Sequence, residues 1–142
     1  MTNVLRVSES ASLGLHTMGL LASRPDELMS IVRIAEVLSV SEATLSKVMQ
    51  RLVHAGQVQS VRGPRGGFRL PRGGEGLSLL AVFEAIEGPL GAGHCLLGRP
   101  ECPRADCVLG KLIADVNAEV RTYLAQTKLS DLKASFLPLE VR

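Results

Sequence analysis

The chain has 142 residues, of which 46% are hydrophobic and 21% are charged, and its formal net charge at pH 7 is +2. This length and composition fit one or two small folded domains and exclude a disordered chain. No stretch approaches the roughly 20 apolar residues of a membrane span, and the first ten residues lack the basic-then-apolar layout of a secretory signal. The sequence therefore predicts a cytoplasmic protein without a membrane segment.

Three helices are predicted in the first third of the chain. Apolar residues at helical spacing begin at Ala11, and the proline in "SRPDE" (23–27) ends this first helix. Ser30 is a good N-cap for a second helix, and Ser41 precedes a third, which ends near "HAG" (54–56). Because only a short polar break separates the second and third helices, they form a candidate helix-turn-helix pair.

A β-hairpin is predicted after the third helix. Apolar and polar residues alternate in "QVQSVRG" (57–63), and the segment "GPRGG" (63–67) has the composition of a turn. The short run "FRL" (68–70) then predicts a second strand. The hairpin therefore carries arginines at its tip, and it follows the helix pair as a wing does in a winged helix-turn-helix.

The C-terminal half is predicted to contain two further helices on either side of a loop. Ser78 precedes an apolar stripe that Gly88 ends, and an irregular loop follows over 93–107. A long stripe at helical spacing predicts a helix over 108–127, followed by a short helical segment. The fold class predicted from the sequence is thus mainly α, with one small β-hairpin.

Positive charge is concentrated in the helix-turn-helix and hairpin. Between Ser41 and Arg72 there are six lysines and arginines but one acid, Glu42, a balance of +5, so the rest of the chain sums to −3. Such a basic region favours a polyanionic partner. With no Trp, one Tyr and three Phe, the chain has few aromatic rings on which unpaired bases could stack, and duplex DNA is favoured over single strands.

The predicted DNA contacts follow from how a winged helix docks. The second helix of the pair enters the major groove, where its first residues reach base edges, and Arg51, one turn further along, suits a phosphate. An arginine on a narrow turn can enter the minor groove. The predicted contacts are Ser41, Thr44, Ser46, Lys47, Arg51, Arg62, Gly63, Pro64 and Arg65. Two alternatives remain open, a solvated basic face and a winged helix that binds protein.

All three cysteines lie in the loop, as Cys95, Cys102 and Cys107 with the spacing C-x6-C-x4-C. In a reducing compartment such a group indicates metal binding or reactivity before disulfides. Thiolates are soft ligands that suit iron–sulfur clusters, zinc or copper(I), and three of them leave one position of a [2Fe–2S] cluster for another residue. The alternatives are plain thiols, one of them a redox sensor, and zinc held together with His94, although the paired C-x2-C spacing of zinc sites is missing.

The DNA-binding segment and the cysteine loop together resemble a known family. "LSVSEATLSKVMQRLVHAGQVQSVRGPRGGFRL" (38–70) is similar to the DNA-binding segment of the IscR/NsrR family of bacterial transcription regulators, and "SVRGPRGGFRL" to its wing. "LGLHTMGLLA" (13–22) resembles its first helix, and "LSLLAVFEAIEG" (77–88) the helix before its cysteine loop. The resemblance, over residues 5 to 135, implies a homodimeric repressor or activator on a palindromic operator, with paired C-terminal helices and an iron–sulfur cluster, most simply [2Fe–2S].

The resemblance does not identify the fourth cluster ligand. The positions that supply it in family members fall on Ser12 and Gly110, and neither of these is a normal ligand. Glu9 lies three residues before Ser12 and shares its helical face, so Glu9 is the candidate. His94 adjoins Cys95, which makes joint coordination of one iron awkward. The other residues that remain possible are His16, Glu101 and Asp106.

These observations predict a winged helix-turn-helix DNA-binding domain over residues 1–77. Residues 78–142 are predicted to hold the cysteine loop (93–107), a dimerisation helix (108–127) and a short C-terminal segment. The predicted function is a transcription regulator whose operator affinity depends on an iron–sulfur cluster that senses nitric oxide, iron–sulfur status or redox stress. A cluster-free thiol or zinc regulator, or a protein-interaction module, is the alternative. No catalytic dyad, phosphate-binding loop or nucleophile motif is present, so an enzyme is disfavoured. The basic hairpin argues against an electron-transfer protein and against an interaction module that does not bind DNA.

Overall fold

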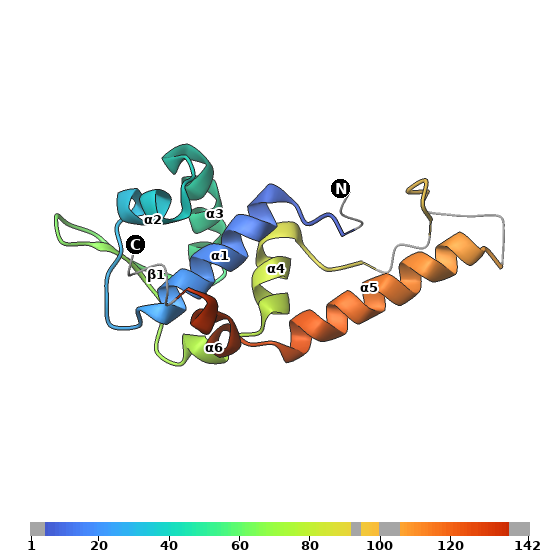
Figure 1. Ribbon diagram of the computed structural model, residues 1–142. Helices are drawn as coiled ribbons and strands as arrows, with labels where there is room; N and C mark the ends of the chain where they lie inside the picture. Colours follow the sequence, from blue (N-terminus) through green and yellow to red (C-terminus); the bar gives the residue numbers. More distant parts are fainter. Residues whose placement is uncertain (1–4, 92–94, 100–105, 137–142) are drawn as a thin grey trace.

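The computed structural model describes residues 5–91, 95–99 and 106–136. Its elements are α1 (Glu9–Ser23), α2 (Ile31–Leu38), α3 (Glu42–His54), β1 (Gln59–Val61), β2 (Gly67–Arg69), η1 (Gly74–Gly76), α4 (Leu79–Glu87), α5 (Val108–Gln126), α6 (Leu129–Leu132) and η2 (Lys133–Ser135). The two strands form one antiparallel hairpin. The predicted fold class, mainly α with one hairpin, is therefore confirmed. Figure 1 shows the other helices and the hairpin gathered together, while α5 projects away from them.

Serine N-caps explain where the helices begin. The hydroxyls of Ser30, Ser41 and Ser78 each accept a hydrogen bond from a backbone N–H three residues on, at the starts of α2, α3 and α4. The first helix begins at Glu9, earlier than its apolar stripe, because Ser8 caps it in the same way. Helix starts are thus a local property of this sequence.

One hydrophobic core joins α1 to the helices on both sides of the hairpin. Leu20 and Leu21 of α1 are fully buried in it, together with Leu45 of α3. Val82 of α4 and Leu129 of α6 belong to the same buried core. The core therefore runs across residue 77, and the boundary predicted there stays a prediction. None of the helices among the described residues is both long enough and apolar enough to cross a membrane.

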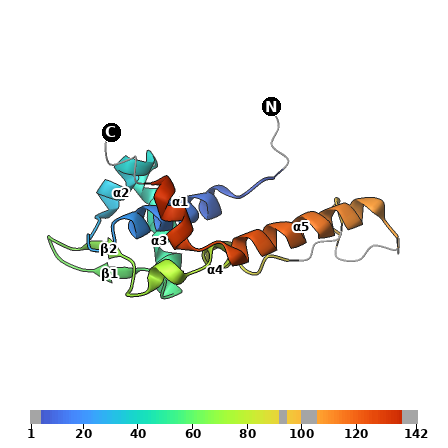
Figure 2. The ribbon, with the colours of Figure 1, turned by 60° about the horizontal axis from the view of Figure 1, so that its bottom comes forward.

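Helix α5 is fixed at its C-terminal end. The segment before α4 and the segment after α5 form an antiparallel bridge, in which the N–H of Leu79 donates to the carbonyl of Thr127 at 2.8 Å. The N–H of Leu129 donates to the carbonyl of Leu77 at 2.9 Å. The opposite end of α5, which begins at Val108, lies far from the other helices in both ribbon views (Figure 1 and Figure 2). The cysteine segment follows α4 and precedes α5, and the bridge joins these two helices at their other ends.

The chain after α6 packs against α1 at Gly19. Phe136 is buried there, and a Cβ atom at Gly19 would lie 2.4 Å from its Cε2 atom. The ring of Phe136 also makes an edge contact with His16. We expect Gly19→Val to displace Phe136 and to lower the free energy of unfolding by about 2 kcal/mol, as over-packing does. Urea unfolding measures this loss, and Gly91→Val, at a site with open space around the Cβ position, is the matched control. Equal stabilities of the two variants would contradict the prediction.

Candidate DNA-binding and cysteine sites

The N-terminus of α3 presents a pair of hydroxyl groups. The Oγ of Ser41 accepts from the N–H of Thr44 at 3.1 Å and donates to the Oγ1 of Thr44 at 2.7 Å. Lys47 is exposed one turn further along, and Ser46 is half-buried. The backbone N–H groups and dipole of a helix N-terminus favour an anion such as a phosphate. The structure therefore brings Ser41, Thr44 and Lys47 to one end and one side of α3.

A groove of about 450 Å³ separates α3 from the hairpin. Its lining includes Ser46 and Gln50 of α3 and Ser60 and Phe68 of the hairpin. His54, at the end of α3, also lines it. Gln50 is not among the predicted DNA contacts, although its spacing indicates this position, because it lies one helical turn after Ser46 on the same face of α3. Residues of α3 and of the hairpin therefore line the two sides of one groove.

The wing is attached to the helices at its base and exposed at its tip. The N–H and carbonyl of Phe68 pair with the carbonyl and N–H of Met29, at 2.8 and 3.0 Å. At the tip, the N–H of Gly66 donates to the carbonyl of Gly63 at 2.9 Å. Residues 62–65 are all exposed, and the hairpin extends beyond α2 on the side opposite α5 (Figure 1). The predicted tip residues thus lie together on one protruding turn.

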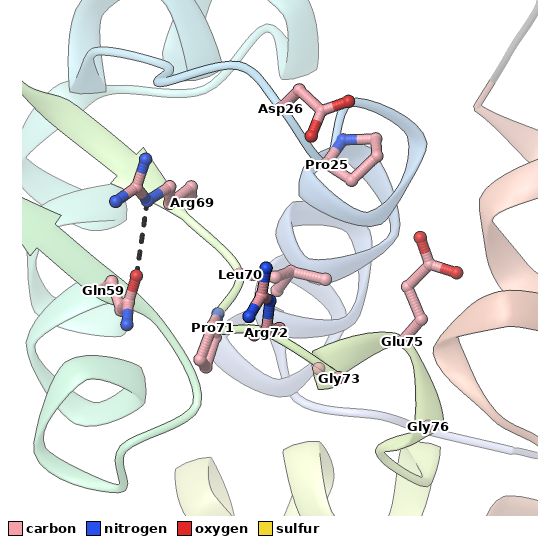
Figure 3. A pocket seen from close by; sticks show the side chains of 11 residues that line it. Pro25, Asp26, Gln59, Arg69, Leu70, Pro71, Arg72, Gly73, Glu75 and Gly76 are labelled. Atoms are coloured by element: carbon pink, nitrogen blue, oxygen red, sulfur yellow. Dashed lines mark hydrogen bonds between the residues drawn. The ribbon is translucent and has the colours of Figure 1, made fainter.

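The other face of the wing borders a second groove, of about 740 Å³. Gln59 and Arg69 are partners in the hairpin register, and the Nε of Arg69 donates to the Oε1 of Gln59 at 3.3 Å. Figure 3 shows both beside Arg72, with Asp26 and Glu75 on the other side of the groove. Because side chains alternate along a strand, Arg69 faces away from α3 while Phe68 faces it. The sequence predicts both arginines only as part of the basic region and does not show which surface they share.

Arg51 has a partner inside the protein. Its Nη1 donates to the backbone carbonyl of Ile86, in the last turn of α4, at 2.6 Å. The phosphate contact predicted for this residue therefore competes with an internal hydrogen bond. Sequence spacing carries no signal of this bond, since the two residues are 35 positions apart.

Two of the three cysteines lie within the described residues. Cys95 and Cys107 are half-buried free thiols, whereas Cys102, His94 and Glu101 lie outside the described residues. The backbone N–H of Arg99, followed by that of Leu97, holds the pKa of the Cys95 thiol below its ordinary value. A group that becomes a thiolate more easily is a better ligand for a soft metal and a better nucleophile. The environment of Cys95 therefore fits either a metal ligand or a reactive thiol.

The position of Glu9 leaves the fourth ligand unassigned. Glu9 is the first residue of α1 and is exposed. Across residues 5–91, 95–99 and 106–136, no three His, Cys, Asp or Glu side chains are grouped as a metal site would need. The Nδ1 of His16 lies 2.6 Å from the carbonyl oxygen of Ser12, so one of its ring nitrogens is already engaged. Glu9 stays a prediction.

Helix α5 exposes a stripe of large apolar side chains. Tyr123 is 67% exposed and Leu112 is 55% exposed, whereas a soluble monomer rarely leaves a contiguous apolar patch uncovered. We call this surface the α5 stripe. Its members are Val108, Leu109, Leu112, Val116 and Tyr123. The long helix predicted over 108–127 is thus present and carries a surface suited to another protein chain.

Several known proteins that resemble the chain are transcription regulators. The chain is 30% identical over 125 residues to the HTH-type transcriptional regulator IscR of Cereibacter sphaeroides, covering 86% of this chain and 81% of that one. It is 38% identical over 76 residues to NsrR of Bacillus subtilis, covering 54% of this chain and 52% of that one. The solved structure of CymR, the global cysteine regulator of B. subtilis, superposes with a TM-score of 0.71 at 25% identity, covering 93% and 98% of the two chains.

The family model gives the same result over nearly the whole chain. The Rrf2 model, described as iron-dependent transcriptional regulator, matches residues 7–135. This match confirms the resemblance stated from the sequence, and it agrees with the observed helices and wing. The chain therefore belongs to the Rrf2 family, whose members are DNA-binding transcriptional regulators and not enzymes.

Proposed function

We propose that this chain is a homodimeric cytoplasmic regulator whose affinity for a palindromic operator is set by a [2Fe–2S] cluster bound to Cys95, Cys102 and Cys107. The observation that carries the proposal is the place of these cysteines in the chain. Their segment joins α4, which packs in the core with α3, to α5, which carries the exposed stripe. A change in the segment therefore acts on both the DNA-binding unit and the dimer contact.

The thiol environment supports the proposed ligands. The backbone N–H groups that lower the pKa of Cys95 favour the thiolate that a cluster requires. When bound, a cluster with one ligand that is not cysteine would supply a centre that reacts with oxidants or nitric oxide. Cys107 stands at the N-cap position of α5, so a ligand there would fix the start of that helix. The match to a family model described as iron-dependent transcriptional regulator supports an iron-containing group at these cysteines.

On DNA, α3 enters the major groove and the wing tip the adjacent minor groove. Ser41 and Thr44 lie at the N-terminus of α3, where base edges and phosphates are nearest. Two subunits would place two recognition helices on half-sites about 34 Å apart, one turn of DNA. The residues proposed to contact DNA are Ser41, Thr44, Ser46, Lys47, Arg62, Gly63, Pro64 and Arg65. Arg51 is not among them, because it donates to the carbonyl of Ile86.

A cluster-free thiol regulator is the second candidate. It is favoured by the structural similarity to CymR, the global cysteine regulator of B. subtilis. The half-buried Cys95 with its lowered pKa would also serve as a reactive thiol. In that case the protein would bind DNA without metal, and its affinity would follow the oxidation of Cys95.

Anaerobic purification of the full chain separates these candidates. We expect a coloured protein with visible absorption bands and with iron and sulfide in equal amounts, and Cys107→Ser should lose both. Leu97→Ser, which replaces an exposed side chain of the same segment, is the matched control and should keep them. A colourless protein that contains zinc, or one with three free thiols and no metal, would contradict the cluster. Glu9→Gln tests the fourth ligand, because loss of the cluster in this variant would support Glu9.

A further inference from the structure

The C-terminal end of α4 is connected to the recognition helix through a backbone carbonyl. The last carbonyls of a helix have no partner within the helix. The carbonyl of Ile86 accepts from Arg51 of α3 at 2.6 Å. If α4 continued, this carbonyl would accept from the N–H of Leu90. That N–H donates to the carboxylate of Glu84 at 3.1 Å. Arg51 thus replaces the partner that Leu90 does not provide.

Leu90 is held through both of its backbone polar groups. Its N–H donates to Glu84 of α4, and its carbonyl accepts from Nη1 of Arg121, on α5, at 3.3 Å. The same Nη1 of Arg121 lies 3.7 Å from the Oε2 of Glu84. Leu90 lies five residues before Cys95. The chain that enters the cysteine segment is therefore clamped between α4 and α5, and we call Glu84, Leu90 and Arg121 the α4–α5 clamp.

The charges of the clamp suit its position. The C-terminal end of a helix carries partial negative charge and favours cations, and α4 has no basic residue in its last turn. Arg51 from α3 and Arg121 from α5 supply the positive charge instead. The side chain of Arg121 is 51% exposed and that of Glu84 is 29% exposed. Because neither side chain belongs to the hydrophobic core, this contact can rearrange without opening that core.

We infer that the α4–α5 clamp and Arg51 are positioning residues that couple the cysteine segment to the recognition helix. The inference rests on the proposed function, because it names the residues through which a change in the segment reaches α3. A shift of the segment moves Leu90, which changes the contacts of Glu84 and Arg121 at the end of α4. The hydrogen bond from Arg51 to Ile86 then carries the displacement to α3. Arg51 acts in this coupling and not as a phosphate contact.

The test compares operator affinity with and without the cluster. The probe is a DNA duplex that the wild-type protein selects from a random library, and each affinity is measured at several salt concentrations. In the wild type we expect the two affinities to differ by about 5- to 150-fold, the usual range of coupling between sites. In Glu84→Gln and in Arg51→Met, the ratio of the tighter to the weaker of these two affinities should fall to within about twofold of 1. Arg51→Lys, which can still donate to the Ile86 carbonyl, should restore most of it.

Two control variants should leave the ratio of the two operator affinities unchanged. Asp115→Asn removes the carboxylate of an exposed ion pair with Lys111, also on α5, and should leave the ratio unchanged. Arg62→Ala, at the wing tip, should weaken binding of both forms by the same factor. The slope of the logarithm of the binding constant against the logarithm of the salt concentration counts the phosphate contacts. If this slope falls by about one unit in Arg51→Met, Arg51 contacts a phosphate, and its assignment to coupling is overturned.

Amide hydrogen exchange gives a readout that needs no cluster. In the cluster-free protein, Glu84→Gln should speed exchange of the Leu90 amide by about tenfold, the equivalent of 1.4 kcal/mol, while Asp115→Asn leaves it unchanged. Equal affinities of the two wild-type forms would show that the proposed cluster control is wrong, and the coupling would fall with it. If the two wild-type forms differ in affinity and the same difference remains in both Glu84→Gln and Arg51→Met, the coupling through these residues is wrong while the cluster control stands.

Discussion

Replacing Leu112 and Val116 together with glutamate is expected to convert a dimer into a monomer and to weaken operator binding by about 100-fold or more, the range that linked binding sites provide. The two side chains are 55% and 39% exposed and lie one helical turn apart on the α5 stripe. In a symmetric dimer each substitution occurs twice, on both sides of the same contact. Four carboxylates would then have to lose their water, a cost that the apolar contact cannot offset.

Sedimentation at several protein concentrations measures the oligomeric state, and DNA binding follows on the same samples. The matched control is Ala118→Glu together with Thr122→Glu, which places the same two charges at the same spacing on exposed positions of α5 away from the stripe. This control should stay dimeric and bind normally. If the stripe variant also stays dimeric, the dimer contact lies elsewhere. If it becomes monomeric but binds DNA as tightly as the wild type, the two half-sites are not read together.

Local signals account for most of what the sequence predicted. Serine caps at Ser30, Ser41 and Ser78 mark helix starts through side chains that act within three residues. The hairpin follows from alternating residues around a glycine-rich turn. These features need no knowledge of distant residues, so one sequence was enough to predict them. The register of Gln59 with Arg69, which determines which arginines share a face, was not predicted.

Contacts between distant segments were not predictable in the same way. The bond between Arg51 and Ile86 spans 35 positions, and the packing of Phe136 on Gly19 joins the two ends of the described fold. Neither pair has a composition or spacing that differs from that of ordinary surface residues. Cysteine spacing indicates a soft-metal site because thiolate chemistry is a property of the residue type. The fourth ligand has no such signal, because it depends on where the loop folds.

Gly66→Ala is expected to reduce operator affinity by about 10- to 100-fold, equivalent to one or two good base contacts. A Cβ atom at Gly66 would lie 2.0 Å from the carbonyl oxygen of Val61 and 2.9 Å from the carbonyl carbon of Arg62. These are backbone atoms of the same hairpin, and they cannot turn aside as a flexible side chain can. The tip must therefore open, and residues 62–65 lose the conformation in which they are presented to DNA.

The loss should be confined to DNA binding, because the tip residues are exposed and lie outside the hydrophobic core. We expect a melting temperature close to that of the wild type, and Gly76→Ala, at a glycine with open space around its Cβ position, should change neither property. A large fall in melting temperature would show instead that the wing supports the fold. Fluorescence anisotropy with the selected duplex measures the affinities, and calorimetry the melting.

Combination with Arg62→Ala shows whether the shape of the turn acts through its arginine. If Gly66 serves only to hold Arg62 and its neighbours in place, the double variant should bind little more weakly than Gly66→Ala alone, because the contact is already lost. Independent effects would add, within about 0.5 kcal/mol. Additive losses would mean that the backbone of the tip meets DNA without Arg62. A shared loss would establish that the glycines of the wing and its arginines form one functional unit, with the glycines supplying shape and the arginines charge.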